Sequence, residues 1–393
     1  MTRRKRLMKK WPLYACIGII GIGLCFFFYI QFTPRAPLAV AEQKKNIIYP
    51  TQYSDTHITE NAKATDQRFK YLATYKKESF LASVISSFQT SANTAIATTN
   101  EPEKGTWLWT PTLDLTPAYW NPIIADAKKN GIHNIYLSID SYLDIYVMPG
   151  GPEKEAKKKA FDGILENFIA AAHKNNMTVD AEAGWRNWAE PWNEYKAFAI
   201  VDYVREFNAT HSEKFRGLQY DIEPYLLDSY EMNKVTVLRN LVDLINETVM
   251  RLDKSDIALS VVIPDFYDST SEETSQFFYG WRYDYAFDHL LRVLERRPGS
   301  QLIVMAYRNR SDGADGSIAI SKDEIKTADD YHTKVIVAQE TGKVLYSYTS
   351  FYNTSRPYFD AQIRNIQEAF DADPSYNGIA IHYINALLEL EQN

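Results

Sequence analysis

From Gly105 to the C-terminus, short apolar runs alternate with longer amphipathic ones, and this repeat constrains the fold more than any other feature of the chain. Sequences with a helical period separate most of the short runs, for example 117–131, 157–176, 235–254 and 356–370. Strands that alternate with helices are typical of parallel β/α units. Eight runs have the length and composition of buried strands: 106–110, 132–140, 177–183, 216–223, 257–263, 301–307, 334–340 and 378–383.

Eight such units predict an α/β fold, a (β/α)8 TIM barrel that occupies residues 105–393. A doubly wound open sheet is the alternative. That fold usually has a glycine-rich turn after its first strand, whereas residues 107–117, WLWTPTLDLTP, contain no glycine. The barrel is therefore favoured.

The N-terminus has the pattern of a membrane anchor. Residues 1–10 carry six basic side chains, and the twenty residues that follow are uncharged. Twenty residues at about 1.5 Å each span the roughly 30 Å hydrocarbon core of a bilayer, and a basic flank stays in the cytoplasm. We therefore predict a cytoplasmic tail (1–10), a transmembrane signal anchor (11–32) and an extracytoplasmic C-terminal domain. A signal peptide cleaved near Ala39–Ala41 is the alternative.

Residues 33–104 look like a stem. They are rich in Thr, Ser, Ala, Gln and Lys, and only 66–88 have the period of a helix. Both cysteines, Cys16 and Cys25, precede this stem, so we expect no disulfide, no cysteine-based metal site and no cofactor in the exported part. The net charge of −7 argues against a nucleic-acid partner.

Polar side chains gather at the carboxyl ends of the predicted strands, where such barrels carry their reacting groups. In 217–225, GLQYDIEPY, the residues Gln219, Asp221 and Glu223 alternate with apolar ones. Buried carboxylates cost several kcal/mol each unless they are paired or used. The other strand ends offer Asp140, Glu182, Asp265, Tyr307, Glu340, His382 and Tyr383. Crowded acids raise one another's pKa, so that one stays protonated while another ionises, as glycoside hydrolysis requires.

The stretch FRGLQYDIEPY (215–225) resembles the fourth-strand signature of family-18 chitinases, D-x-x-D-x-D-x-E. Arg216 and Gln219 replace the first two acids of that signature. The residues that match it are Phe215, Gly217, Leu218, Asp221 and Glu223.

Later segments follow in the order of that family. Residues 259–265 are similar to its fifth strand, and 304–307, VMAY, to its sixth, with Arg308 where an Asp usually follows. Residues 182–185, EAGW, are a weaker match to its third strand, and His382 stands where the family keeps a Trp.

The resemblance implies that Glu223 is the general acid, that Asp221 orients the 2-acetamido group of the substrate, and that Tyr307 stabilises an oxazolinium-like intermediate. By the same resemblance, Arg216 and Gln219 in place of two acids would weaken a proton relay below the pair. Gln219 can still hydrogen-bond to Asp221, but it cannot accept a proton.

A second mechanism uses Glu223 and Glu340. Their places at the ends of the fourth and seventh strands resemble the retaining glycosidases with an acid/base Glu and a nucleophilic Glu roughly 5 Å apart. Those enzymes usually have Asn before the first Glu, whereas this chain has Ile222. Both retaining mechanisms stay open at this point.

Aromatic side chains favour a sugar ligand, because exposed rings stack on pyranose faces. Trp185 and Trp188 follow the third strand, where packing in the core would explain them equally well. The predicted substrate-binding set is Trp185, Trp188, Gln219, Asp140, Glu182, Asp265, His382 and Tyr383, with no metal.

Purely structural roles compete with binding for several of these polar residues. Asp180 or Glu182 could form an ion pair with an Arg, and Asp140 and Asp265 could cap the segments that follow them. Glu340 could belong to an ordinary turn, and His382 could be a structural histidine at the rim.

Together these features predict a membrane-anchored, extracytoplasmic glycoside hydrolase-like protein that acts on a cell-envelope or surface polysaccharide. The alternative is a non-catalytic glycan-binding barrel. It is favoured by Arg216, Gln219 and Arg308, which stand at positions that are acidic in the related enzymes.

Overall fold

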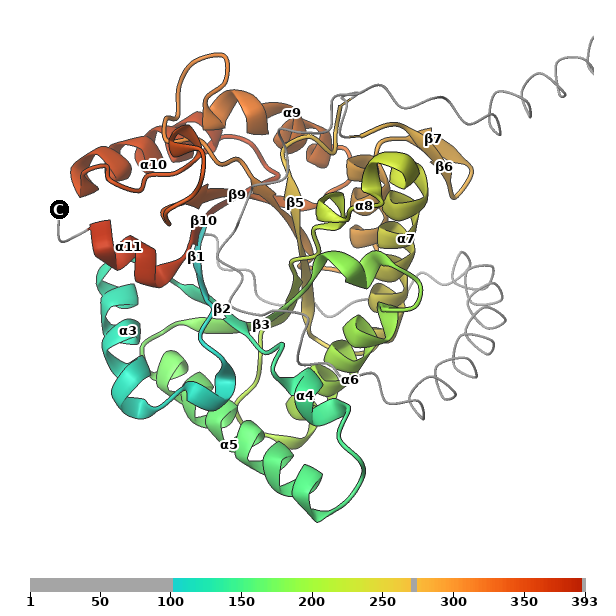
Figure 1. Cartoon of the computed structure of the whole chain (residues 1–393). Coiled ribbons are helices and arrows are strands. Elements are labelled where there is room, and N and C mark those ends of the chain that lie inside the picture. Colours follow the sequence, from blue (N-terminus) through green and yellow to red (C-terminus); the bar gives the residue numbers. More distant parts are fainter. Residues whose placement is uncertain (1–101, 270–273, 391–393) are drawn as a thin grey trace, which may run out of the picture. The chain divides into compact units, whose positions relative to one another are not determined.

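The computed structural model describes residues 102–269 and 274–390. Eight parallel strands close into a barrel in the order β1-β10-β9-β8-β5-β4-β3-β2 (Figure 1). This confirms the predicted (β/α)8 barrel, and each predicted strand corresponds to one barrel strand. The strands are β1 (Glu103–Leu108), β2 (Asn134–Ser138), β3 (Thr178–Ala183), β4 (Gly217–Tyr220), β5 (Ala258–Pro264), β8 (Gln301–Met305), β9 (Lys334–Glu340) and β10 (Tyr376–His382).

Helices form a ring outside the strands (Figure 1). The Thr116 hydroxyl accepts a hydrogen bond from the amide of Tyr119, which caps α3 at its N-terminus. The helix predicted at 356–370 coincides with α10. The helices are α3 (Pro117–Lys129), α4 (Tyr142–Tyr146), α5 (Pro152–Lys174), α6 (Glu194–Thr210), α7 (Tyr230–Arg251), α8 (Ala286–Leu294), α9 (Ser317–Asp329), α10 (Arg356–Phe370) and α11 (Ile384–Leu390).

Shorter elements lie in the connections. An antiparallel hairpin lies between β5 and α8, beside α7 and α8 in Figure 1. The hairpin consists of β6 (Phe277–Tyr279) and β7 (Arg282–Asp284), and the 3-10 helices are η2 (Thr112–Asp114), η3 (Arg186–Ala189), η4 (Pro224–Leu226) and η5 (Ser347–Thr349).

The core has two layers. Apolar side chains fill the space between the strands and the surrounding helices. A second cluster fills the barrel interior and includes Trp107, Tyr136, Ile303 and Tyr307. Trp107 is fully buried, so this strand tryptophan packs in the barrel rather than presenting a sugar platform.

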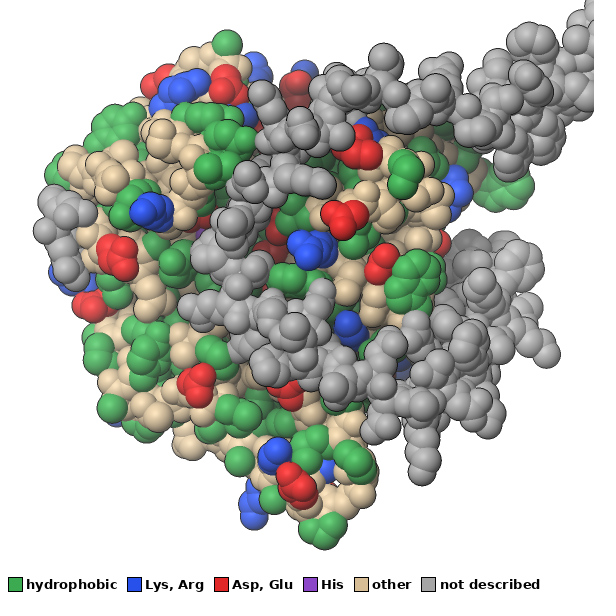
Figure 2. All heavy atoms as spheres, viewed as in Figure 1, with side chains coloured by type: hydrophobic (Ala, Val, Ile, Leu, Met, Phe, Trp, Pro, Cys, Tyr) green, Lys and Arg blue, Asp and Glu red, His purple; other side chains and the backbone are tan. Residues whose placement is uncertain are grey.

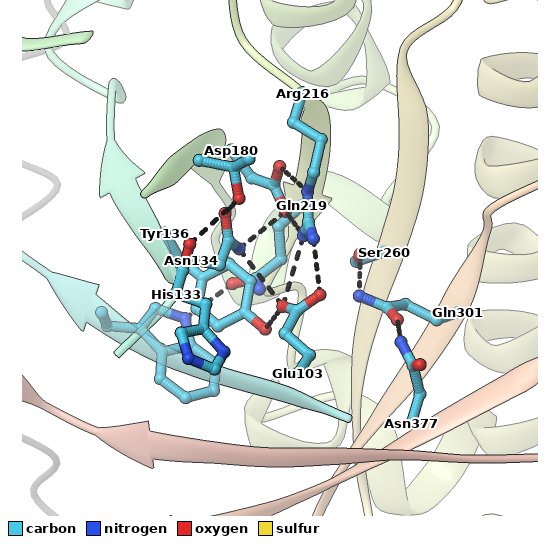
Figure 3. Close-up of polar contacts among 12 residues, drawn as sticks. Glu103, His133, Asn134, Tyr136, Asp180, Arg216, Gln219, Ser260, Gln301 and Asn377 are labelled. Atoms are coloured by element: carbon cyan, nitrogen blue, oxygen red, sulfur yellow. Dashed lines mark hydrogen bonds and ion pairs between the residues drawn. The ribbon is translucent and has the colours of Figure 1, made fainter. Parts of the chain in front are cut away.

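A polar network fills the amino-terminal end of the barrel (Figure 3). The Arg216 guanidinium donates to Glu103 Oε2 at 2.6 Å and to Asp180 Oδ1 at 2.9 Å. Asn134 Nδ2 donates to Asp180 Oδ2 at 3.0 Å, and the Tyr136 hydroxyl donates to Glu103 Oε1 at 2.6 Å. The ion pair expected for the third strand therefore forms at Asp180.

Arg216 consequently has a different role from the one inferred from its motif position. It precedes β4, whereas Asp221 and Glu223 follow that strand, so it lies at the opposite end of the barrel from them. Its charge balances two buried carboxylates there. Arg216 therefore does not support the alternative of a barrel that only binds glycans.

The predicted tail (1–10), anchor (11–32) and most of the stem (33–104) lie outside the described residues. Among residues 102–269 and 274–390, no helix is long and apolar enough to cross a bilayer. On the face of the barrel in Figure 2, acidic and basic side chains of the described residues are interspersed.

Candidate active site

The carboxyl ends of the barrel strands bring the predicted polar residues to one rim. Asp140 follows β2, Glu182 lies in β3, Asp221 and Glu223 follow β4, and Asp265 follows β5; Tyr307 follows β8, Glu340 ends β9, and His382 ends β10 with Tyr383 next to it. Because the barrel is closed, residues separated by more than two hundred positions become neighbours there.

A hydrogen bond joins Glu340 to His382. The Nδ1 atom of His382 lies 2.7 Å from Glu340 Oε2, and the Gly342 amide donates to Glu340 Oε1 at 2.6 Å. Trp109 Nε1 donates to His382 Nε2 at 3.0 Å. An indole N–H can only donate, so Nε2 accepts and the ring proton sits on Nδ1. Sequence reasoning missed this role of Trp109, although Trp107 and Trp109 alternate on one strand and therefore point the same way.

His382 lies among aromatic rings. Its ring centroid is 5.5 Å from Trp107, 5.6 Å from Trp109, 6.1 Å from Tyr307 and 5.2 Å from Tyr383. Burial lowers the pKa of His382, but the charge and hydrogen bond of Glu340, followed by the charges of Asp221 and Glu223, outweigh it and leave the pKa raised. With Nε2 accepting from Trp109 the ring is neutral, and its protonation would break that hydrogen bond and place a positive charge beside the two acids.

Asp221 and Glu223 are half-buried at the end of β4. That strand ends at Tyr220, earlier than predicted, but the Asp221 amide still donates to Ala183 O at 3.1 Å. Glu223 directly precedes η4, and the Tyr225 hydroxyl donates to its Oε1. Sequence reasoning also missed Tyr225, whose nearness to Glu223 depends on the turn at Pro224.

Both acids have raised pKa values. Burial, followed by the charge of Glu223, raises the pKa of Asp221 to about 8, although His382 opposes the shift. Burial raises the pKa of Glu223 against the Tyr225 hydrogen bond and the charges of His382 and Arg186. A carboxyl that keeps its proton near neutral pH can act as a general acid.

Two more acids lie beside this pair. Asp140 Oδ1 accepts a hydrogen bond from the Gly184 amide at 3.3 Å, and burial raises the pKa of Asp140 to about 7. Burial, followed by the charges of Asp140 and Asp221, raises the pKa of Glu182 well above its ordinary value. Glu182 has no ion pair within the described part of the chain, so the ion-pair interpretation holds for Asp180 and not for Glu182.

Gln219 is buried inside the barrel. Its Oε1 accepts from Trp107 Nε1 at 2.6 Å, while its Nε2 has no hydrogen-bond partner among the residues that the structure describes. The expected hydrogen bond from Gln219 to Asp221 is therefore wrong, because Trp107 fixes the orientation of the amide.

Asp265 and Arg308 form an ion pair. Arg308 Nη2 lies 3.4 Å from Asp265 Oδ2 and also contacts Asp315. This pairing favours a structural role for Asp265 over the predicted contact with substrate. Tyr307, with 9% of its side chain exposed, packs in the barrel interior beside His382.

The two tryptophans after β3 differ from each other. Trp188 is 2% exposed and packs edge-on against Tyr220, with ring centroids 6.2 Å apart, so its predicted stacking on a sugar is wrong. The 3-10 turn η3 folds this side chain back into the core. Trp185 is partly buried, and Arg186 lies over its ring at 5.3 Å. Trp185 remains a candidate for sugar contact.

No three His, Cys, Asp or Glu side chains in the described ranges are arranged to hold a metal ion. The rim brings together carboxyls and an imidazole, which are groups that can transfer protons.

Comparisons with known proteins give similar folds. No protein-family model matches the sequence, and no curated protein sequence matches it. Similar solved structures include a GH18 chitinase from Pseudoalteromonas aurantia, with 14% identity, a TM-score of 0.44, and 73% of this chain and 99% of that chain covered. A β-mannanase from the blue mussel Mytilus edulis has 10% identity, a TM-score of 0.45, and coverage of 74% and 90%. The spore cortex-lytic enzyme SleL of Bacillus megaterium has 13% identity, a TM-score of 0.42, and coverage of 78% and 76%.

The similar solved structures thus include proteins named as GH18 chitinases and as a β-mannanase. The side chains at the rim supply the chemistry from which a function can be argued.

Proposed function

We propose that this protein is a glycoside hydrolase in which Glu223 is the general acid. The observation that carries this proposal is the pair of half-buried carboxyls Asp221 and Glu223, both with raised pKa values and both facing His382. A protonated Glu223 can give its proton to the glycosidic oxygen as the bond to the anomeric carbon breaks. General acids of this kind contribute roughly 10²- to 10⁴-fold to the rate.

The positive charge that develops on the sugar then needs a partner. Glu340 is 1% exposed, and both of its oxygens already accept hydrogen bonds, from His382 and Gly342. These contacts do not suit Glu340 as a nucleophile. We propose instead that Glu340 is a positioning residue that orients His382.

The remaining route uses the substrate itself. An acetamido oxygen on C2 of the sugar can attack the anomeric carbon from within the substrate, and a carboxyl that accepts the acetamido N–H supports this attack. Asp221 Oδ1 has no hydrogen-bond partner among residues 102–269 and 274–390, which leaves an acceptor next to Glu223. We therefore propose an N-acetylated polysaccharide of a cell envelope or surface as the substrate class.

The proposed location rests on the sequence. The basic residues 1–10 and the apolar segment 11–32 would tether the barrel on the extracytoplasmic side of a membrane.

A non-catalytic glycan-binding barrel is the second candidate. The amide of Gln219 favours it, because Gln219 cannot hold a proton next to Asp221.

The test is hydrolysis by the full-length protein in non-ionic detergent, with matched polysaccharides that are N-acetylated or chemically deacetylated. We expect release of reducing ends from the acetylated polymers only. Cleavage of both forms at equal rates would contradict the substrate-assisted route. Saturable binding without cleavage, unchanged in Glu223→Gln, would contradict the hydrolase and support the binding protein.

A further inference from the structure

Glu182 is a buried carboxyl without a hydrogen-bond partner. Its side chain is fully buried in β3, and neither oxygen has a partner in the described part of the chain. Ser138, its register partner on β2, makes no hydrogen bond of ordinary geometry with it, although it lowers the pKa to a small degree. Because an unpaired buried polar group costs about 1–3 kcal/mol, each such group in a native fold requires an explanation.

The backbone brings Glu182 to Asp221. Two residues after Glu182, the Gly184 amide donates to Asp140, and a Cβ on Gly184 would overlap the carbonyl oxygen of Asp221. The ends of β3 and β4 are therefore in close contact, and only a glycine permits it. The charge of Asp221 is among the causes of the raised pKa of Glu182.

Gln219 faces Glu182 across the two strands. These residues are register partners, and both are fully buried. The oxygen of the Gln219 amide is used by Trp107, and an amide cannot take up a proton. At this register position of β3 and β4, the only carboxyl is that of Glu182 on β3.

We propose that Glu182 and Asp221 share one proton, so that Glu182 acts as the positioning residue for Asp221. This inference rests on the proposed function for its role in the reaction. In the substrate complex the proton is on Glu182, whose O–H donates to one oxygen of Asp221, and the ionised Asp221 accepts the acetamido N–H with the other. After the product leaves, the proton returns to Asp221. The charge of Asp221 opposes ionisation of Glu182, which keeps one proton between the two carboxyls.

Other charged groups act on this pair and have to be considered. Asp140 and Glu223 face it with negative charge, and His382 lies beside Asp221 and Glu223. The charge of Lys196 lowers the pKa of Asp140, and the charge of Arg186 lowers the pKa of Glu223. A pH profile alone would mix these effects, so the test combines substitutions.

The first test moves the carboxyl from β3 to β4. We expect Glu182→Gln to lower kcat/KM at least tenfold on the acetylated polymer, and the double variant Glu182→Gln with Gln219→Glu to recover to within about threefold of the wild type. An unchanged kcat/KM–pH profile in Glu182→Gln would overturn the proposal.

The second test needs no activity, so it separates this inference from the proposed function. The unfolded chain releases the protons of both carboxyls above their ordinary pKa values of about 4, whereas the native pair keeps its shared proton, so the wild type loses stability as the pH rises. Glu182→Gln reduces that loss, because Asp221 without a neighbouring Glu182 carboxylate ionises at lower pH. We expect its urea midpoint to exceed that of the wild type by a margin that is absent at pH 4 and grows up to pH 7.

A shared proton makes the effects of substitutions at Glu182 and Asp221 on the urea midpoint non-additive. In an Asp221→Asn background the pH-dependent gain from Glu182→Gln should shrink, whereas strictly additive midpoints at every pH would overturn the sharing. Glu324→Gln is the matched control, because Glu324 is also a buried carboxyl, with a pKa raised to about 9 by burial, but lies on α9. It should raise the midpoint without coupling to Asp221. If the urea midpoints show coupling but neither the wild type nor any variant hydrolyses a polysaccharide, the proposed function is contradicted and the proton-sharing proposal still stands.

Discussion

His382 Nδ1 lies 2.7 Å from Oε2 of Glu340, and this pair links the ends of β9 and β10 beside the acids of β4. The contact joins residues 42 positions apart. It accounts for the burial of Glu340 and for the orientation of the only imidazole placed beside Asp221 and Glu223 in the described residues.

Glu340→Gln should therefore lower kcat more than it weakens substrate binding. The amide removes the negative charge that raises the pKa of His382, and it cannot accept from both His382 and the Gly342 amide. We expect kcat to fall about 10- to 100-fold, in the range of lost positioning and acid–base effects, while KM changes less than threefold. Steady-state kinetics on a soluble acetylated oligosaccharide measures both. A rise in KM with unchanged kcat would contradict this role.

Arg186→Gln should change the pH dependence of the reaction. The charge of Arg186 lowers the pKa of Glu223, so its removal raises that pKa further. A general acid works only while protonated, so the alkaline limb of kcat/KM should move to higher pH. A shift to lower pH, or no shift, would indicate that Glu223 is not the group that must be protonated. Arg205→Gln, on the exposed surface of α6, is the control and should leave the profile unchanged.

Gly184→Ala should disturb the site, because its new Cβ would overlap the backbone of Asp221. We expect the activity to fall at least tenfold and the urea midpoint to decrease. The matched control is Gly163→Ala in α5, where nothing lies within 4 Å of the new Cβ. That change should stabilise the helix by roughly 0.5–1 kcal/mol and leave the activity unchanged.

Arg216→Met should destabilise the barrel without acting on the rim. It leaves Glu103 and Asp180 buried without their cation, a loss of about 3–5 kcal/mol. Burial raises the pKa of Glu103, but Arg216 more than offsets this and lowers it, so that stabilisation is present at neutral pH and is lost as the pH falls through the native pKa. Urea unfolding should show a deficit that is largest near pH 7 and shrinks below about pH 4. An equal deficit at both pH values would contradict the ion-pair account.

The barrel was predictable because strand and helix periods alternate along the chain, and the carboxyl ends of parallel strands meet at one rim. That rule placed Asp221, Glu223, Glu340 and His382 together without any knowledge of their contacts. The alternating polar residues after Gly217 are costly to bury unless they are paired or used, and this cost indicated the same rim.

Side-chain partners were not predictable in the same way. The ETGK turn after β9 has an ordinary turn sequence, and the role of Glu340 depends on His382 and the Gly342 amide, which occupy its oxygens. The burial of Trp188 depends on η3, which turns this loop side chain inward. Motif position alone gives Arg216 the wrong role, because its partner Glu103 is 113 residues away in the sequence.

The most direct test of Glu223 as general acid compares leaving groups. Glu223→Gln should lose about 10²- to 10⁴-fold in kcat/KM on the acetylated polymer, whose leaving sugar needs a proton. It should lose less than tenfold on a 2,4-dinitrophenyl glycoside of N-acetylglucosamine, whose leaving group needs none. Equal losses on both substrates, or full activity on the polymer, would contradict the account.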